Sequence, residues 1–215
     1  MIMTSQSHFV QPPRLAMWLL TLFALDDAAE HILGDLLEEF TRLASKSGVP
    51  FARRWCWRQT LKTVFQLAAQ GFRTAPWLTT AAVVGGFFLR GVVGRLVEPT
   101  IFAAIERYQI PDHHFSAYVF LATTGIDIGY LITFLFVGFI VAFVAKGREM
   151  VATMALGLIF GAMVVVALPV EVMRFGHATP LSGLMWYFSD SLAIVIAGAI
   201  VRTHRLGAAT RHQQA

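Results

Sequence analysis

The sequence predicts an all-α, polytopic membrane protein, in which a short cytoplasmic helical module precedes a four-helix transmembrane bundle. Only 14% of the 215 residues are charged and 56% are hydrophobic, whereas about 25% of a typical soluble protein is charged. The chain also contains apolar runs that reach the length of about 20 helical residues needed to cross a bilayer.

Four segments meet that length requirement: 76–97, 117–144, 150–171 and 184–201. The first is the least apolar because Arg90 and Arg95 lie within it. These segments divide the chain into a module at 1–74, a membrane region at 75–201 and a basic cytoplasmic tail at 202–215.

The distribution of Lys and Arg predicts the orientation of the spans. With the N-terminus inside, eight basic residues precede the first span, two lie in the loop "KGRE" and three lie in the tail. Each outer loop then holds one, Arg107 or Arg174. Because cytoplasmic loops are enriched in Lys and Arg, both termini are expected to be cytoplasmic.

The apolar run at 15–25, which follows Arg14, has two interpretations. It has the charge and apolar run of a signal peptide. However, it is only eleven residues long and no clean small-residue cleavage site precedes the acidic "DDAAE". We therefore expect a short amphipathic or docking helix.

An amphipathic helix is predicted for 26–46. Its apolar residues recur at three- and four-residue intervals, and Gly48 is placed to end it. The helix is acidic, and Asp35, Glu38 and Glu39 are among its acids.

A second, basic helix is predicted for 51–72. Its expected apolar face comprises Trp57, Leu61, Val64, Phe65 and Ala68, while Arg54, Arg58 and Lys62 recur every four residues on another face. The two helices are expected to form a hairpin whose opposite charges pair at the rim. The candidate docking or membrane-surface residues are Arg53, Arg54, Trp55, Trp57, Arg58 and Lys62.

Three ordered motifs resemble a known family. "PPRLAMWLL" (12–20), "ILGDLLEEF" (32–40) and "ARRWCWRQTLK" (52–62) are similar to the permease prefix domain found ahead of FtsX/MacB-type ABC permeases in acidobacteria and related bacteria. The resemblance implies kinship of this prefix module alone and does not transfer export activity. The hypothesis that it motivates is a bacterial inner-membrane protein with an ABC permease or a regulator as its partner. In that family an aromatic residue usually occupies the position of Cys56, which argues against a catalytic thiol.

The rest of the chain departs from such a permease. Only about nineteen residues, 98–116, connect the first two spans, where the permeases have a large extracytoplasmic domain. No GxxxxGK[ST] phosphate loop is present, and no nucleophile, base and orienting group can be assembled from spacing. The sequence therefore predicts a non-enzymatic protein without a cofactor.

Charged residues inside the predicted spans require an explanation, because each costs about 2.5 to 3.5 kcal/mol at a helix centre on insertion scales. Pairing of Arg90 with Asp127 or Asp190 would offset this cost and hold the bundle in register. The alternative is a polar site for a proton, ion or small solute, lined by 123–127 and 189–191. The whole polar cluster comprises Arg90, Arg95, Asp127, Glu171 and Asp190.

Two GxxxG pairs lie in the spans: Gly125 with Gly129, and Gly157 with Gly161. Such pairs let helix backbones approach closely, so they predict packing within the bundle or, alternatively, a homodimer. In the outer loop, Asp112, His113 and His114 could ligate a metal, although solvated histidines are the simpler interpretation and no metal site is predicted.

The leading functional hypothesis is an accessory or regulatory partner of an ABC permease or membrane-stress system that docks through its cytoplasmic module. The alternative is a small transporter or sensor that uses Asp127 and Asp190. Nucleic-acid binding is not expected, because the helix that precedes the basic one is acidic and no recognition motif follows.

Overall fold

The computed structural model describes residues 11–24, 26–175 and 181–213, and its side chains except those of 26–28, 112–113, 167–175, 181–184, 186–187 and 209–213. Every regular element in these residues is a helix, which confirms the all-α prediction. The chain divides into two compact units, Met1–Thr74 and Ala75–Ala215.

The described part of the first unit contains three helices: α1 (Arg14–Phe23), α2 (Asp26–Ser47) and α3 (Val49–Thr74). Gly48 alone separates α2 from α3 and has a φ of +86°, a left-handed conformation that glycine adopts without steric cost. The apolar run of α1 is not an isolated docking helix. Its Ala16 and Leu20 enter one core with Leu36 and Phe40 of α2 and Cys56 of α3.

The predicted apolar face of the basic helix is wrong in part. Ala52, Cys56, Thr60 and Val64 form the buried stripe of α3, at four-residue spacing. Leu61 and Phe65 were expected in that interface, but their side chains are 49% and 70% exposed. The buried stripe consists mostly of small side chains, because α1 and α2 both pack closely against it.

Among the described residues of the second unit, four segments are long and apolar enough to cross a bilayer: Pro76–Arg107, Phe115–Val144, Glu149–Val166 and Phe188–Ala208. The first is α4 (Pro76–Arg107), which continues past Pro99. After α5 (Ile110–His113), the second span combines α6 (Phe115–Phe120), the π-helical turn η1 (Leu121–Gly125) and α7 (Ile126–Val144). The last two spans are parts of α8 (Glu149–Phe175) and α9 (Leu181–Gln213).

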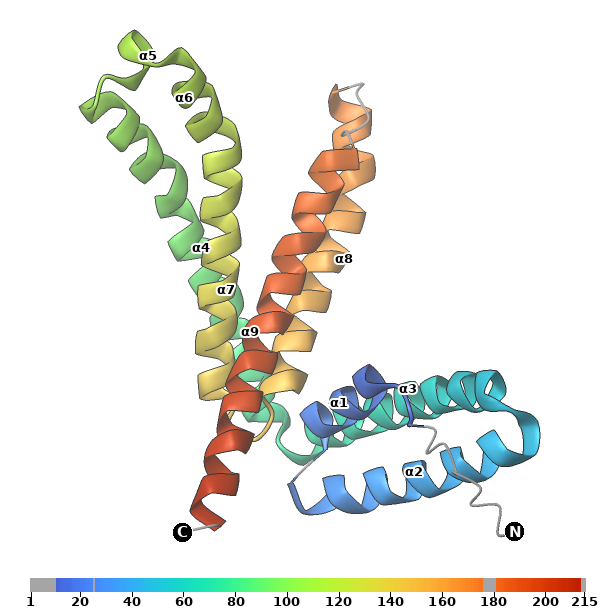
Figure 1. Cartoon of the computed structure of the whole chain (residues 1–215). Helices are drawn as coiled ribbons and strands as arrows, with labels where there is room; N and C mark the ends of the chain where they lie inside the picture. The colour runs from blue at the N-terminus through green and yellow to red at the C-terminus, as the bar shows by residue number, and fades with distance from the viewer. Residues whose placement is uncertain (1–10, 25, 176–180, 214–215) are drawn as a thin grey trace. The chain divides into compact units, whose positions relative to one another are not determined.

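In this unit α4 packs against α7 and α8 packs against α9, and the most extensive contact, between α7 and α9, joins these two pairs (Figure 1). The pairs meet at the end of the unit where a short turn joins α7 to α8. The core lies there, with Val137 and Val141 of α7, Leu156 of α8 and Ile194 of α9 fully or almost fully buried. Toward the opposite ends the two pairs diverge in Figure 1.

Glycines permit the closest helix contacts. A Cβ on Gly138 of α7 would lie 2.9 Å from the backbone of Ile194 in α9, and one on Gly198 of α9 would collide with Thr153 of α8. These two glycines belong to neither predicted GxxxG pair. Since small residues let helices in a bilayer pack closely, α9 gains its contacts with both neighbours at these points.

Three of the four predicted GxxxG glycines face another helix of the same chain. A Cβ on Gly129 would lie 2.6 Å from the Val97 side chain of α4, and one on Gly157 would lie 3.1 Å from the Ser191 carbonyl of α9. Gly161 also faces Ser191, whereas Gly125 is near Leu121 of its own helix. Packing between helices of the same chain therefore accounts for Gly129, Gly157 and Gly161, whereas the atoms nearest to Gly125 belong to its own helix.

Candidate functional site

Three of the predicted intramembrane charges come from three different helices, and two of them act on the third. Arg90 lies on α4, Asp127 in the first turn of α7 and Asp190 on α9. The charges of Arg90 and Asp127 both act on the Asp190 carboxylate. The fold thus brings together residues that are separated widely in the sequence.

The Arg90 guanidinium lies against aromatic rings of α7. Its central carbon is 4.8 Å from the Phe134 ring centroid and 5.2 Å from that of Tyr130, which are cation–π distances. Nε of Arg90 and Oδ1 of Asp190 are buried without a hydrogen-bond partner. The predicted direct pairing of Arg90 with Asp127 or Asp190 is not among the ion pairs of the described residues.

The other two members of the predicted cluster do not join it. Arg95 is exposed on α4, five positions after Arg90 and hence on a different side of the helix. Glu171 lies within α8, but its side chain is outside the described residues. Nearby, the Tyr130 hydroxyl donates a hydrogen bond of 2.8 Å to Glu98, which links α7 to α4.

The π-helical turn η1 ends at Gly125, two residues before Asp127. It contains Thr123, Thr124 and Gly125, part of the segment that the sequence predicts to line a polar site. Short π-helical insertions in α-helices occur frequently at functional sites, because the wider turn redirects the side chains around it. The turn therefore distinguishes this stretch from a regular apolar span.

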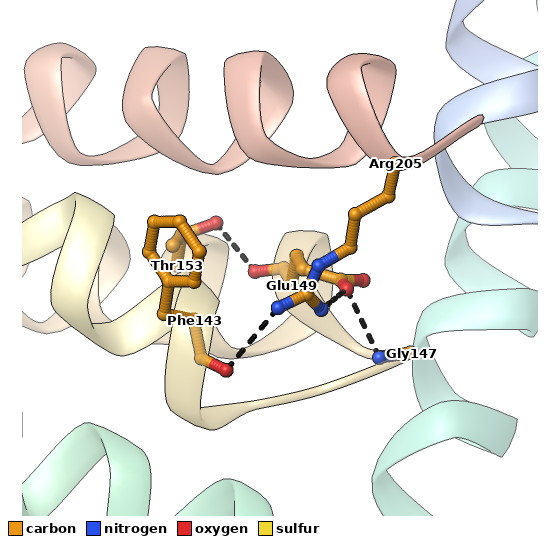
Figure 2. A network of polar contacts seen from close by, with 5 residues as sticks. All are labelled: Phe143, Gly147, Glu149, Thr153 and Arg205. Carbon is orange, nitrogen blue, oxygen red and sulfur yellow. Dashed lines mark hydrogen bonds and ion pairs between the residues drawn. The ribbon is translucent and has the colours of Figure 1, made fainter. Parts of the chain in front are cut away.

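A second polar group, which the sequence did not predict, lies around the turn between α7 and α8 (Figure 2). Glu149, 1% exposed, accepts hydrogen bonds from Nη1 of Arg205 and from the Gly147 amide, the latter at 3.0 Å. Nη2 of Arg205 donates to the Phe143 carbonyl at 3.3 Å. The group joins the α7–α8 turn to α9.

Sequence reasoning missed this group because it counted Arg202 and Arg205 only as positive charges of a cytoplasmic tail. In the structure α9 continues without a break to Gln213, and Arg202 is 7% exposed. One feature of the sequence does indicate such a group: Glu149 lies beside Lys146 and Arg148 in "KGRE", at the start of an apolar segment. An acid at the start of an apolar helix is suited to an N-terminal helix dipole and to a basic partner.

In the first unit, the predicted docking residues divide between the surface and the core. The exposed ones are the basic residues of α3: Arg53, Arg54, Arg58 and Lys62. Trp55 and Trp57 are half-buried and pack against the module core.

Among the described side chains, the acidic residues of α2 do not pair with α3 as expected. Asp35 and Glu38 are exposed on α2, and Glu39 forms an ion pair of 2.6 Å with Arg42 of the same helix. The expected pairing between α2 and α3 is absent from the ion pairs of the described residues.

Cys56 is fully buried in the module core. Burial raises the pKa of its thiol, because a thiolate would lose its solvation there. A reactive cysteine requires an accessible thiolate, so this residue has a packing role.

No grouping of three or more His, Cys, Asp or Glu side chains suited to a metal occurs within the described residues, and the side chains of Asp112 and His113 lie outside them. Comparison with protein-family models, with curated proteins and with solved structures finds no match to this chain.

Proposed function

We propose that the chain is a non-enzymatic protein of the bacterial inner membrane, with both termini in the cytoplasm. In this proposal it is an accessory or regulatory partner of an ABC permease or membrane-stress system and docks through its helical module. The observation that carries the proposal is the independent core of the module, which joins the first spanning helix through Ala75 alone.

The exposed side chains of the module support a binding role. On α1, Leu15 is 65% exposed and Trp18 is 44% exposed. Both belong to the first of the three motifs that resemble the permease prefix domain. Exposed tryptophans are effective anchors in protein interfaces because they bury a large apolar area at low entropic cost.

Affinity purification of the tagged full-length chain from cross-linked native membranes tests this proposal. The chain should recover an ABC permease or a membrane-bound regulator, and Trp18→Ala should reduce the recovery. Trp77→Ala is the matched control, since Trp77 is 86% exposed but lies on α4. Recovery of no permease or regulator, or equal recovery by both variants, would contradict docking through α1.

A second candidate function, transport or sensing, is favoured by the unpartnered buried atoms of Arg90 and Asp190. Asp190→Asn and Arg90→Gln should be compared singly and together. Loss of folded protein in each single variant, rescued in the double variant, supports a structural role. A change of solute flux or signalling at normal expression supports transport or sensing.

A further inference from the structure

One face of α3 exposes apolar and basic side chains together. Its apolar members are Phe65, 70% exposed, Phe51, 53% exposed, Leu61, 49% exposed, and Phe72, 46% exposed. Arg54, Arg58 and Lys62 are exposed beside them. At about 100° per residue these positions lie opposite the buried stripe formed by Ala52, Cys56, Thr60 and Val64.

No acidic side chain among the module's described residues forms an ion pair with the basic side chains of this face. The sequence of α3 contains no Asp or Glu, and the module's ion pair among the described residues joins Glu39 to Arg42 within α2. A solvated surface helix is normally polar on its outer face, so four exposed apolar side chains on this side require an occupant.

The chemistry of the face matches an anionic lipid surface. Aromatic and leucine side chains can enter the boundary between headgroups and acyl chains, while Arg and Lys extend toward phosphate groups. The chain also keeps this helix close to a bilayer, because α3 ends at Thr74 and the spanning helix α4 begins at Pro76. A lipid surface is therefore always within reach, at a high effective concentration.

We propose that this α3 face, defined by Phe51, Arg54, Arg58, Leu61, Lys62, Phe65 and Phe72, binds the anionic headgroup surface of the bilayer that the chain spans. This inference goes beyond the proposed function, since it assigns α3 to lipid and leaves α1 for a protein partner. Each basic side chain near an anionic surface contributes about a fivefold change in the ratio of docked to undocked module. Removing the three basic side chains Arg54, Arg58 and Lys62 should therefore lower the ratio of docked to undocked module roughly 100-fold.

The test uses the full chain in nanodiscs of phosphatidylcholine, with or without phosphatidylglycerol. A nitroxide on Phe65→Cys reports collisions with oxygen, which concentrates in lipid, and with a water-soluble nickel chelate. The control is Glu38→Cys, an exposed position on α2. The native Cys56 is buried, so the unsubstituted chain measures background labelling.

In anionic discs, the label at 65 should be accessible to oxygen and protected from nickel, while the label at 38 remains accessible to nickel. Combined Arg54→Glu, Arg58→Glu and Lys62→Glu substitutions, or high salt, should return the label at 65 to water. A label accessible to nickel in both lipids would overturn the proposal. Equal exposure of the label to lipid in pure phosphatidylcholine would also overturn it, because binding would not depend on anionic headgroups. Protection of the label from both oxygen and nickel would overturn it as well, because it would indicate a contact with protein.

Because these discs contain no other protein, failure here leaves the proposed partner untouched. Conversely, failure to recover a partner through Trp18 has no effect on the position of the label at 65.

Discussion

The carboxylate of Glu149 accepts a hydrogen bond from Arg205, which lies 56 positions later in the chain, and this contact joins the start of α8 to the far end of α9. The two partners are not equally solvated. The Glu149 side chain is 1% exposed, whereas that of Arg205 is 29% exposed. Removing either partner should therefore have different consequences.

Arg205→Met should destabilise the membrane unit more than Glu149→Gln. The first substitution leaves a buried carboxylate without its counter-ion, and breaking a buried pair in this way costs roughly 3 kcal/mol. The second leaves an arginine that water can reach. The free energy of unfolding of each full-length variant can be measured in mixed detergent micelles, with Lys146→Met at an exposed position as the control. An equal loss of unfolding free energy for the two substitutions would contradict this prediction, because it would show that water reaches the Glu149 carboxylate.

Gly138→Ala should weaken packing between α7 and α9. The added methyl would lie 2.9 Å from the Ile194 backbone, which cannot rotate away as a side chain can. Overpacking of this kind costs about 1 to 3 kcal/mol. Gly85→Ala is the matched control, because a Cβ there meets no atom within 4 Å. The same detergent titration should show a loss for Gly138→Ala alone, and a comparable loss at Gly85 would point to a general effect of removing glycine.

Cys56 should react slowly with thiol reagents in the native chain and rapidly once the module unfolds. Burial raises the pKa of this thiol, so the folded state favours the protonated form. The module therefore keeps its full stability below the ordinary thiol pKa of about 8.5 and loses stability as the pH rises above it. Thermal unfolding between neutral and alkaline pH, compared with Cys56→Ala, should show this loss in the native chain only. Fast native alkylation would instead place the thiol at the surface.

Reporter fusions should place both termini and the α7–α8 turn in the cytoplasm. Lys146 and Arg148 lie in this turn, and eight basic residues precede α4, so the positive-inside rule favours this orientation. An alkaline phosphatase fused after residue 215 should be inactive, and one fused after residue 109 should be active. Activity of the C-terminal fusion would reverse the proposed topology.

The sequence by itself determined the helical class and the positions of the main elements. Apolar runs of membrane-spanning length predicted the four spans, because a bilayer requires uninterrupted helices of that length. Periodicity and a terminal glycine likewise predicted α2 and its end at Gly48. These are local properties, which neighbouring residues determine without reference to the rest of the chain.

Only the tertiary structure decided which faces and which charges meet. Leu61 and Phe65 fit an apolar stripe in the sequence, but the close approach of two helices favours the smaller side chains of Ala52 and Cys56 in the α3 interface. The pairing of Glu149 with Arg205 likewise depends on how far α9 continues beside the α7–α8 turn. Such contacts join residues far apart in the chain, and they follow from packing geometry that no local periodicity specifies.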